Sequence, residues 1–257
     1  MLLELDHISK IYGDLRAVDD LNLTVPEGEW LAIVGSSGSG KTTLMNMIGC
    51  MDTPSKGSVK LEGRKLEDLN ATQLADVRKN LIGLVFQKFY LVPHLTAVEN
   101  VMVAQYYHSV VDEKQAMEAL EKVGLKDRAH HLPGQLSGGQ RQRAALVRTL
   151  QTGKPLLLLD EPFGALDAIT RLHLQALLTE IATKKRLTIL FVTHDVDEAL
   201  LLSDAILVMG TAPGRILQQY TLEEPRPRTM RVLSQPEFIR VKGEILTLLD
   251  KEVTADA

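Results

Sequence analysis

The sequence has 257 residues, of which 45% are hydrophobic and 24% are charged, and its formal net charge is −4. A chain of this length and composition can bury one substantial core, which excludes wholesale disorder. Proteins that follow nucleic-acid phosphates carry a basic excess, so the acidic balance argues against a nucleic-acid partner.

The N-terminal segment, Met1–Asp6, has neither a basic region nor a long apolar region, so we expect no secretory signal. No run approaches the roughly 20 apolar residues that a bilayer-spanning helix needs. The single cysteine, Cys50, cannot form an internal disulfide, which fits a reducing compartment. These features predict a cytosolic chain that would reach a membrane only through a partner.

Short apolar runs alternate with helical patterns along the chain, which is typical of an α/β sheet. Strands are predicted at Leu2–Ile8, Leu21–Val25, Trp30–Val34, Ser58–Leu61, Ile82–Phe86, Leu156–Asp160, Thr188–Thr193 and Ala205–Met209. The third, sixth and seventh of these are almost entirely apolar, as central strands covered on both faces should be.

Helical patterns replace strands between Gln87 and Pro155, with helices predicted at Thr96–Tyr106, Asp112–Val123 and Gly138–Gln151. Residues 224–228 indicate a linker, after which apolar residues repeat at the spacing of an amphipathic helix, at Phe238, Val241, Ile245 and Leu248. The predicted organisation is an α/β core of residues 1–87 and 156–215, an inserted helical subdomain of residues 88–155, and a C-terminal extension of residues 216–257.

A glycine-rich segment between the third strand and a helix at Lys41–Ile48 matches the pattern G-x-x-x-x-G-K-[ST]; it consists of Gly35, Ser36, Ser37, Gly38, Ser39, Gly40, Lys41 and Thr42. The backbone N–H groups of such a loop, with the positive end of the helix, bind phosphate. Lys41 is expected to reach the β- and γ-phosphates of ATP, and the Thr42 hydroxyl to ligate Mg²⁺. Thr43 is included among the nucleotide-binding residues.

Asp160 and Glu161 follow four leucines that fit only a buried strand, so both are expected at its carboxyl end, where open α/β sheets bind ligands. Asp160 is expected to hold Mg²⁺ through its water shell, and Glu161 to act as general base on the attacking water. The alternative is that the two residues only begin a turn before Pro162.

The segment Leu136-Ser137-Gly138-Gly139-Gln140 resembles the signature motif of ABC-type ATPases. Ser137 is a natural N-cap, and Gly138 and Gly139 expose N–H groups at the start of the next helix, which predicts a second anion site. The phosphate loop already surrounds the phosphates from one side. The second site is therefore expected to close on the nucleotide of another copy, giving a homodimer with two ATP molecules between the protomers.

The resemblance covers residues 2 to about 215. It implies a P-loop NTPase fold of the ABC type, with a RecA-like sheet core, N-terminal antiparallel strands and an inserted helical subdomain. It also implies that Tyr12 stacks on adenine, that Gln87 links Mg²⁺ and the attacking water to the helical subdomain, that Asp167 lies in a loop crossing the dimer interface, and that His194 contacts the γ-phosphate. Each of these side chains would otherwise fit an ordinary packed or solvated role.

The two halves of the chain resemble different branches of this family. Residues 48–52, 82–87 and 95–101 resemble ATPases of lipoprotein release and macrolide export, whereas residues 160–171, 212–216 and 234–249 are similar to nitrate, sulfonate and taurine import ATPases. Import is favoured because that likeness runs through a long tail, and export is the alternative. The resemblance implies an integral-membrane permease as partner, a position at the cytoplasmic face of the membrane and, for an importer, a substrate-binding protein.

Functions of other classes fit the sequence less well. Soluble ABC ATPases of DNA repair or chromosome architecture insert long coiled coils before the signature, and no sustained heptads occur between Gln87 and Ser137. Translation-associated ABC proteins normally carry two cassettes, and this chain has one. An ATP-gated scaffold without activity stays open only if Glu161 is not the base.

Overall fold

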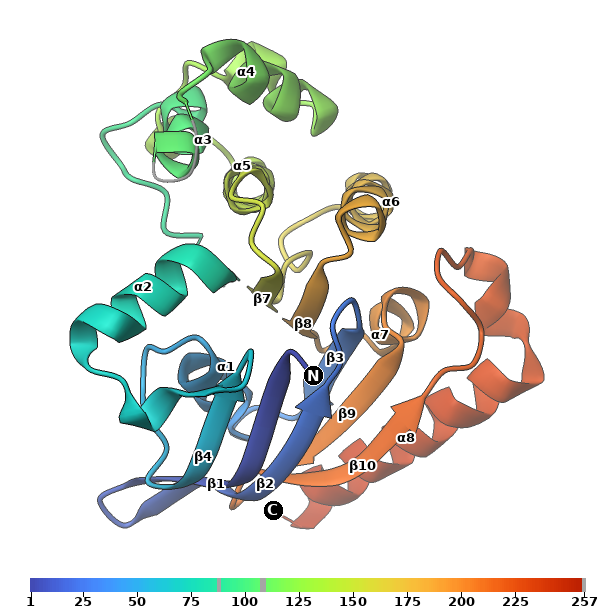
Figure 1. Ribbon diagram of the computed structural model, residues 1–257. Coiled ribbons are helices and arrows are strands. Elements are labelled where there is room, and N and C mark those ends of the chain that lie inside the picture. The colour runs from blue at the N-terminus through green and yellow to red at the C-terminus, as the bar shows by residue number, and fades with distance from the viewer. Residues whose placement is uncertain (87–88, 107–109, 256–257) are drawn as a thin grey trace.

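The computed structural model describes residues 1–86, 89–106 and 110–255, which form two β-sheets covered by helices (Figure 1). The larger sheet has the strand order β10-β9-β3-β8-β7-β6. Its strands are β3 (Trp30–Gly35), β6 (Ile82–Val85), β7 (Leu156–Asp160), β8 (Thr188–Val192), β9 (Ala205–Gly210) and β10 (Arg215–Thr221). All pairs are parallel except β9 with β10, so the carboxyl ends of the five parallel strands share one edge.

The smaller sheet is antiparallel, with the order β2-β1-β4-β5. It consists of β1 (Leu3–Tyr12), β2 (Leu15–Val25), β4 (Lys56–Leu61) and β5 (Arg64–Lys65). The β1–β2 hairpin pairs Tyr12 with Leu15, so both residues lie at its tip. An isolated bridge between Val18 and Gly214 ties this hairpin to the segment before β10.

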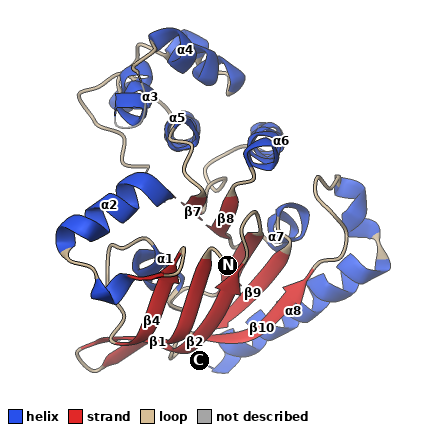
Figure 2. Cartoon of the chain, in the orientation of Figure 1, coloured by secondary structure: helices blue, strands red, loops and turns tan. Residues whose placement is uncertain are grey.

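The helices are α1 (Lys41–Ile48), α2 (Ala71–Leu81), α3 (Ala97–Tyr106), α4 (Glu113–Lys122), α5 (Gly138–Gln151), α6 (Ala168–Lys185), α7 (Val196–Leu202) and α8 (Pro236–Ala255). Short 3-10 turns cover residues 66–68, 126–128, 133–135 and 230–234. Figure 2 shows α3, α4 and α5 grouped beyond the β6–β7 side of the larger sheet, where α5 contacts β6. The helix α8 lies along β9 and contacts it.

Successive residues of the central strands belong to two different cores. In β3, Leu31 and Ile33 pack with α1 and the smaller sheet, whereas Trp30, Ala32 and Val34 pack with α5 to α8 on the opposite face. This division follows from the alternation of side chains along a strand. Because β3 is buried on both faces, the loop at its carboxyl end starts from a fixed position.

The predicted central strands and the helices at 138–151 and 97–106 are confirmed. The sequence patterns do not predict every element that the structure contains; the additional ones are β5, β10, α2, α6 and α7. The strand β10 is half exposed and polar at Gln218 and Gln219, as an edge strand tolerates, and it extends the larger sheet past residue 215. The helix α2 fully buries only Val77, with Leu74 and Leu81 partly buried on the same face, so its apolar stripe is short; a further signal is the capping box of Asn70 and Gln73. No helix within the described ranges is long and apolar enough to span a membrane.

Candidate nucleotide site

The glycine-rich loop joins β3 to α1 and turns through a conformation that favours glycine. Gly40, the N-cap of α1, has φ 81°, and a Cβ on it would lie 2.6 Å from the carbonyl oxygen of Ala17. A side chain there would be strained twice, by its backbone angle and by the contact. The helix α1 therefore starts in close contact with β2. Its first backbone N–H groups, which have no partner within the helix, lie at the glycine-rich loop.

Lys41 folds back over this loop. Its Nζ donates to the carbonyl oxygens of Gly35 at 2.9 Å and Ser36 at 2.6 Å, and to the Oγ of Ser39 at 3.0 Å. Burial lowers the pKa of Lys41, and the charges of Asp160 and Glu161 oppose that shift. The Oγ of Ser36 is buried and makes no hydrogen bond within the described part of the chain. An ammonium group on neutral acceptors, beside an unused hydroxyl, suits an anionic ligand, whose oxygens accept charge-assisted hydrogen bonds.

Two carboxylates stand at the carboxyl end of β7, facing this loop. Burial raises the pKa of Asp160, the neighbouring charge of Glu161 raises it further, and Lys41 opposes both. Glu161 has φ 48°, and its N–H donates to the carbonyl of Val192 on β8 at 3.0 Å. The Nδ1 of His194 lies 3.5 Å from Oε1 of Glu161, and 72% of the His194 side chain is exposed. Lys41, Asp160, Glu161 and His194 thus meet although they come from three separate segments.

Tyr12 forms the opposite end of the site, at the tip of the β1–β2 hairpin. Its ring is 45% exposed, its hydroxyl donates to the carboxylate of Asp52, and the Nζ of Lys10 lies 4.9 Å from the ring centroid. Burial of the hydroxyl, together with Asp52, raises the pKa of Tyr12 to about 12. A neutral ring that is held by its hydroxyl and open on its surface can stack on a planar ligand.

These residues line a cleft of about 800 Å³, within the usual range of small-molecule sites. The predicted residues that line it are Tyr12, Gly35, Ser37, Gly38, Ser39, Gly40, Lys41, Thr42, Thr43, Asp160, Glu161 and His194. Ser36 belongs to the loop without lining the cleft, and Gln87 lies outside the described residues. The sequence reading misses Leu15, Arg16, Ala17, Val192, Thr211, Ala212 and Gly214, which complete the wall.

The signature segment does not line this cleft. Ser137 caps α5: its Oγ accepts the N–H of Gln140 at 3.2 Å, and the Gln140 side chain accepts the N–H of Ser137 at 2.8 Å. Asp167 likewise caps α6 by accepting the N–H of Thr170 at 3.0 Å, and that bond lowers the pKa of Asp167. Gly138, Gly139, Gln140 and Asp167 are absent from the cleft wall, as is Ser137.

Gln142 is a buried residue that connects the two regions and that the sequence reading does not single out. Its Nε2 donates to the carbonyl of Glu161 at 2.8 Å, and its Oε1 accepts the N–H of Ala165 at 3.2 Å. A Cβ on Gly139 would lie 3.1 Å from the carbonyl oxygen of Ala165, so α5 packs directly on this loop. The available signal is a glutamine among apolar positions of an amphipathic helix, where a polar group needs partners.

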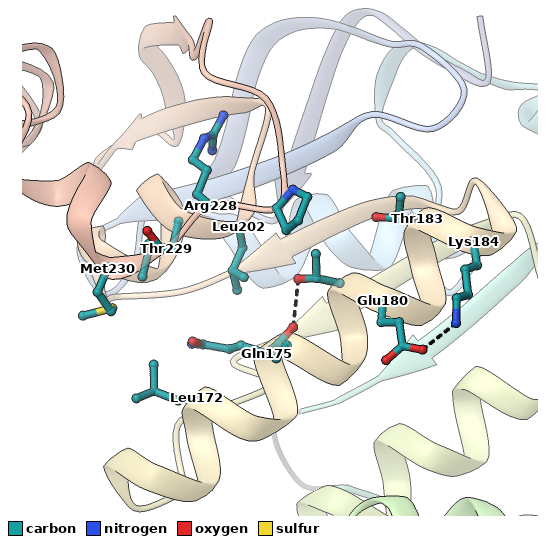
Figure 3. Close-up of a pocket in the computed structure, with 13 residues that line it drawn as sticks. Leu172, Gln175, Glu180, Thr183, Lys184, Leu202, Arg228, Thr229 and Met230 are labelled. Carbon is teal, nitrogen blue, oxygen red and sulfur yellow. Dashed lines mark hydrogen bonds and ion pairs between the residues drawn. The ribbon is translucent and has the colours of Figure 1, made fainter.

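A second groove, of about 520 Å³, lies between α6, the end of α7 and residues 227–230 (Figure 3). Leu172, Leu202 and Met230 give it an apolar lining, and the Glu180–Lys184 pair, 2.6 Å apart, stands at its edge. None of the predicted site residues line it. Of its polar side chains, Thr179 and Arg228 donate to backbone carbonyls, Gln175 donates to Glu198, and Lys184 pairs with Glu180. The groove therefore offers no convergent charges comparable to those of the first cleft.

Comparison with known proteins gives a consistent result. A family model described as ABC transporter matches residues 18–164. The bicarbonate transport ATP-binding protein CmpD of Synechocystis sp. is 38% identical over 96% of this chain and 88% of its own length. The nitrate import ATP-binding protein NrtC of Synechocystis sp. is 38% identical over 98% of this chain, which spans 38% of NrtC.

A relative of the other branch and a solved structure are also similar. The macrolide export ATP-binding/permease protein MacB of Photorhabdus laumondii is 40% identical over 76% of this chain, which spans 31% of MacB. A dimeric structure of the ATP-binding cassette MJ0796, in a post-hydrolysis state bound to ADP and Pi, matches with a TM-score of 0.80 and 35% identity. It covers 87% of this chain and 100% of the MJ0796 chain.

Proposed function

The chain belongs to the ABC transporter family as an ATP-binding and ATP-hydrolysing subunit, and we propose that the cleft around Lys41 is where it binds and hydrolyses ATP. The observation that carries this assignment is the meeting of Lys41 with Asp160 and Glu161 at the edge where parallel strands end. The phosphates lie on the loop and on Lys41, and the adenine lies against Tyr12.

The residues at the loop fit Mg²⁺ as a companion of ATP. Thr42 offers a hydroxyl and Asp160 a carboxylate in the same cleft, and hard oxygen ligands are those that Mg²⁺ prefers. The raised pKa of Asp160 is what a buried carboxylate shows before a cation compensates its charge. Bound Mg²⁺ would neutralise phosphate charge during hydrolysis. Gln87, outside the described residues, is proposed to contribute to the same metal site.

Glu161 and His194 are proposed to act on the reacting phosphate. Glu161 accepts a proton from the attacking water as general base. Two hydrogen bonds fix its backbone: its carbonyl accepts from the side chain of Gln142, and its N–H donates to the carbonyl of Val192. His194 lies within 3.5 Å of that carboxylate and is exposed to the cleft side, where its ring can contact the γ-phosphate. Both side chains come from strand ends, so they hold their places without a loop closing.

The signature segment is proposed to act on the ATP of a second copy. Ser137, Gly138, Gly139, Gln140 and Asp167 stand outside the cleft of their own chain. The N-terminus of α5 presents backbone N–H groups and the positive end of the helix dipole, which together favour an anion. Because the ATP of the same chain is proposed to lie in the cleft around Lys41, the anion at α5 would belong to the ATP of the second copy. Two copies related by a two-fold axis would each complete the site of the other. The dimeric form of the MJ0796 cassette supports this arrangement.

The transport function is proposed to be import through a separate permease at the cytoplasmic face of the membrane. The CmpD and NrtC relatives align over 96% and 98% of the chain, so their similarity includes the tail beyond residue 221, whereas MacB aligns over 76%. A small inorganic anion is the proposed class of cargo, and a substrate-binding protein is a proposed further partner. Export remains the second candidate because the identity to MacB is 40%.

The nucleotide site is tested with Lys41→Ala. Loss of the ammonium group removes the charge-assisted bonds to the phosphates, so affinity for ATP should fall at least ~10-fold. The matched control is Lys60→Ala, which removes a lysine from β4, in the smaller sheet. Isothermal titration of ATP into each purified variant measures the affinity. Equal affinity in wild type and Lys41→Ala would place ATP elsewhere.

The direction of transport is tested by purifying Glu161→Gln from membranes in ATP and identifying the permease that accompanies it. A compact permease that also binds an extracytoplasmic solute-binding protein supports import. A permease with a large extracytoplasmic domain of its own contradicts it and favours export. The double variant Lys41→Ala, Glu161→Gln is the control, because it should not be trapped by ATP.

A further inference from the structure

The C-terminal helix α8 reaches the nucleotide cleft through one side chain, and we infer that Glu252 is a positioning residue that sets the affinity of the cleft for ATP. This inference rests on the proposed nucleotide site. Glu252 lies near the end of α8, and its side chain is 13% exposed. Figure 1 shows α8 running along β9 and β10, so that its last turns come back to the loop between these strands.

Glu252 holds that loop by two different contacts. Its Oε2 accepts the backbone N–H of Thr211 at 2.8 Å, and its Oε1 lies 3.1 Å from Nη2 of Arg215. The Nη1 of Arg215 in turn donates to the carbonyl of Thr211 at 2.8 Å. One carboxylate therefore fixes both ends of the segment 211–215. A Cβ on Gly210 would collide with the carboxylate, so the glycine is what admits it.

The segment held by Glu252 is part of the cleft wall. Thr211, Ala212 and Gly214 all line the cleft, on the side of the β2 residues Leu15, Arg16 and Ala17. Gly214 exchanges backbone hydrogen bonds with this side: its N–H donates to Ala17 at 3.2 Å, and its carbonyl accepts from Asp19 at 2.9 Å. A Cβ on Gly214 would lie 2.5 Å from the carbonyl oxygen of Ser39, so the segment packs directly on the phosphate loop.

The segment adopts a backbone conformation that needs external support. Ala212 has φ 47°, in the left-handed region that residues with a Cβ rarely occupy. Such conformations persist only where surrounding contacts determine them. The contacts at Thr211 and Arg215 flank Ala212 on both sides, and both lead to Glu252. Without the carboxylate, the segment would relax toward other conformations and the wall would have to be reordered each time ATP binds.

The test compares Glu252→Gln with Asp250→Asn, an exposed acidic residue two positions earlier on the same helix. Both changes remove one negative charge from α8, but only Glu252 contacts the segment. We expect Glu252→Gln to raise the Kd and the KM for ATP about three- to tenfold, the range for the net contribution of one ordinary hydrogen bond, while kcat stays within about twofold. Asp250→Asn should match wild type in all three quantities.

A second variant guards against a loss of folding. Arg215→Gln breaks the same ion pair from the other side, and it should raise KM in the same direction, with the double variant no worse than the stronger single one. Wild-type Kd and KM in folded Glu252→Gln and Arg215→Gln would overturn the inference. Failure of the underlying site looks different: there, Lys41→Ala would bind ATP as tightly as wild type, whatever the Glu252 variants do.

Discussion

The phosphate-loop cleft and the start of α5 are both rich in glycine and polar groups, yet their polar groups are used in opposite ways. In the cleft, charged groups from separate segments converge on open space, as Lys41, Asp160 and Glu161 do. At the start of α5, Ser137 and Gln140 satisfy each other in a capping box and do not line that cleft. The first region has the convergent charges of the proposed ATP site. The second is a helix N-terminus whose capping groups are already paired, which leaves the positive end of the helix dipole to interact with an anion.

In the proposed two-fold arrangement, this difference means that one chain would supply the catalytic groups and only half of the contacts to each nucleotide. The two regions are nevertheless joined inside the chain, because Gln142 on α5 binds both Glu161 and Ala165. A change at the start of α5 therefore has a short, hydrogen-bonded route to the backbone of Glu161, the proposed general base. We expect variants of the cleft to slow hydrolysis most, variants at the start of α5 less, and variants of the Gln142 connection less again.

The largest effect is expected for the cleft itself. Glu161→Gln removes the carboxylate that is proposed to take up the proton of the attacking water, so hydrolysis should slow at least ~100-fold while ATP binding is kept. Steady-state ATPase rates and nucleotide titration measure the two quantities. Glu118→Gln, an exposed residue of α4, is the control for the loss of one charge. Normal turnover in Glu161→Gln would remove this residue from its proposed role.

The next effect belongs to the start of α5. Ser137→Arg puts a long cation where another copy should deliver its nucleotide, so hydrolysis should drop roughly 100-fold, the lower end of the effect of losing one donor to a developing charge. Binding of ATP by the isolated chain should not change. Ser137→Ala separates the loss of the hydroxyl from the added bulk and charge, and it should cost about 1 kcal/mol of stability through the lost cap. If Ser137→Arg keeps wild-type turnover, the two regions do not form a shared site.

Much of both regions can be predicted from the sequence, because local sequence patterns determine the backbone conformation of each. The four leucines before Asp160, the apolar run before Gly35 and the cap at Ser137 are each local patterns with one structural solution. Their meeting at one edge follows from parallel strands, whose carboxyl ends coincide.

Other parts of the site depend on contacts between distant segments and leave no local pattern. Thr211 and Gly214 enter the cleft only because β10 turns back beside β9, and β10 is a polar edge strand without an apolar signature. Gln142 is a second case: its two partners lie 19 and 23 residues away in the chain. The sequence shows that a buried glutamine needs partners, but not which ones it finds.

The connection itself should give a smaller effect. Gln142→Met keeps the volume but removes the bonds to Glu161 and Ala165, so the general base loses its support from α5. Hydrolysis should fall about 10-fold, a modest part of the general-base contribution, and stability should fall by about 1–3 kcal/mol because two backbone groups lose their partner. ATPase rates and chemical unfolding give the two values. An unchanged rate in a destabilised protein would make Gln142 a packing residue only.

The smallest effect concerns a second connection, which runs from the β8 end to the loop before α6. Arg171 lies 3.7 Å from Glu198 and 3.4 Å from Asp195, and it donates to the carbonyl of Leu166 at 3.3 Å. Glu198 is buried, accepts from Thr193 at 2.7 Å and from Gln175 at 3.1 Å, and burial raises its pKa above 4.5.

A raised carboxyl pKa makes the folded state bind the proton more tightly than the unfolded state does. The stability that this supplies is present below the ordinary pKa and is lost as the pH rises through the raised value. Glu198→Gln has no such proton, so the stability difference between wild type and variant should decline with pH in that window, by at most about 1.4 kcal/mol per pH unit for one proton. Chemical unfolding at a series of pH values measures this slope. A difference that is flat above pH 4.5 would mean that Arg171 compensates the buried charge completely, and that the connection holds equally well in both protonation states.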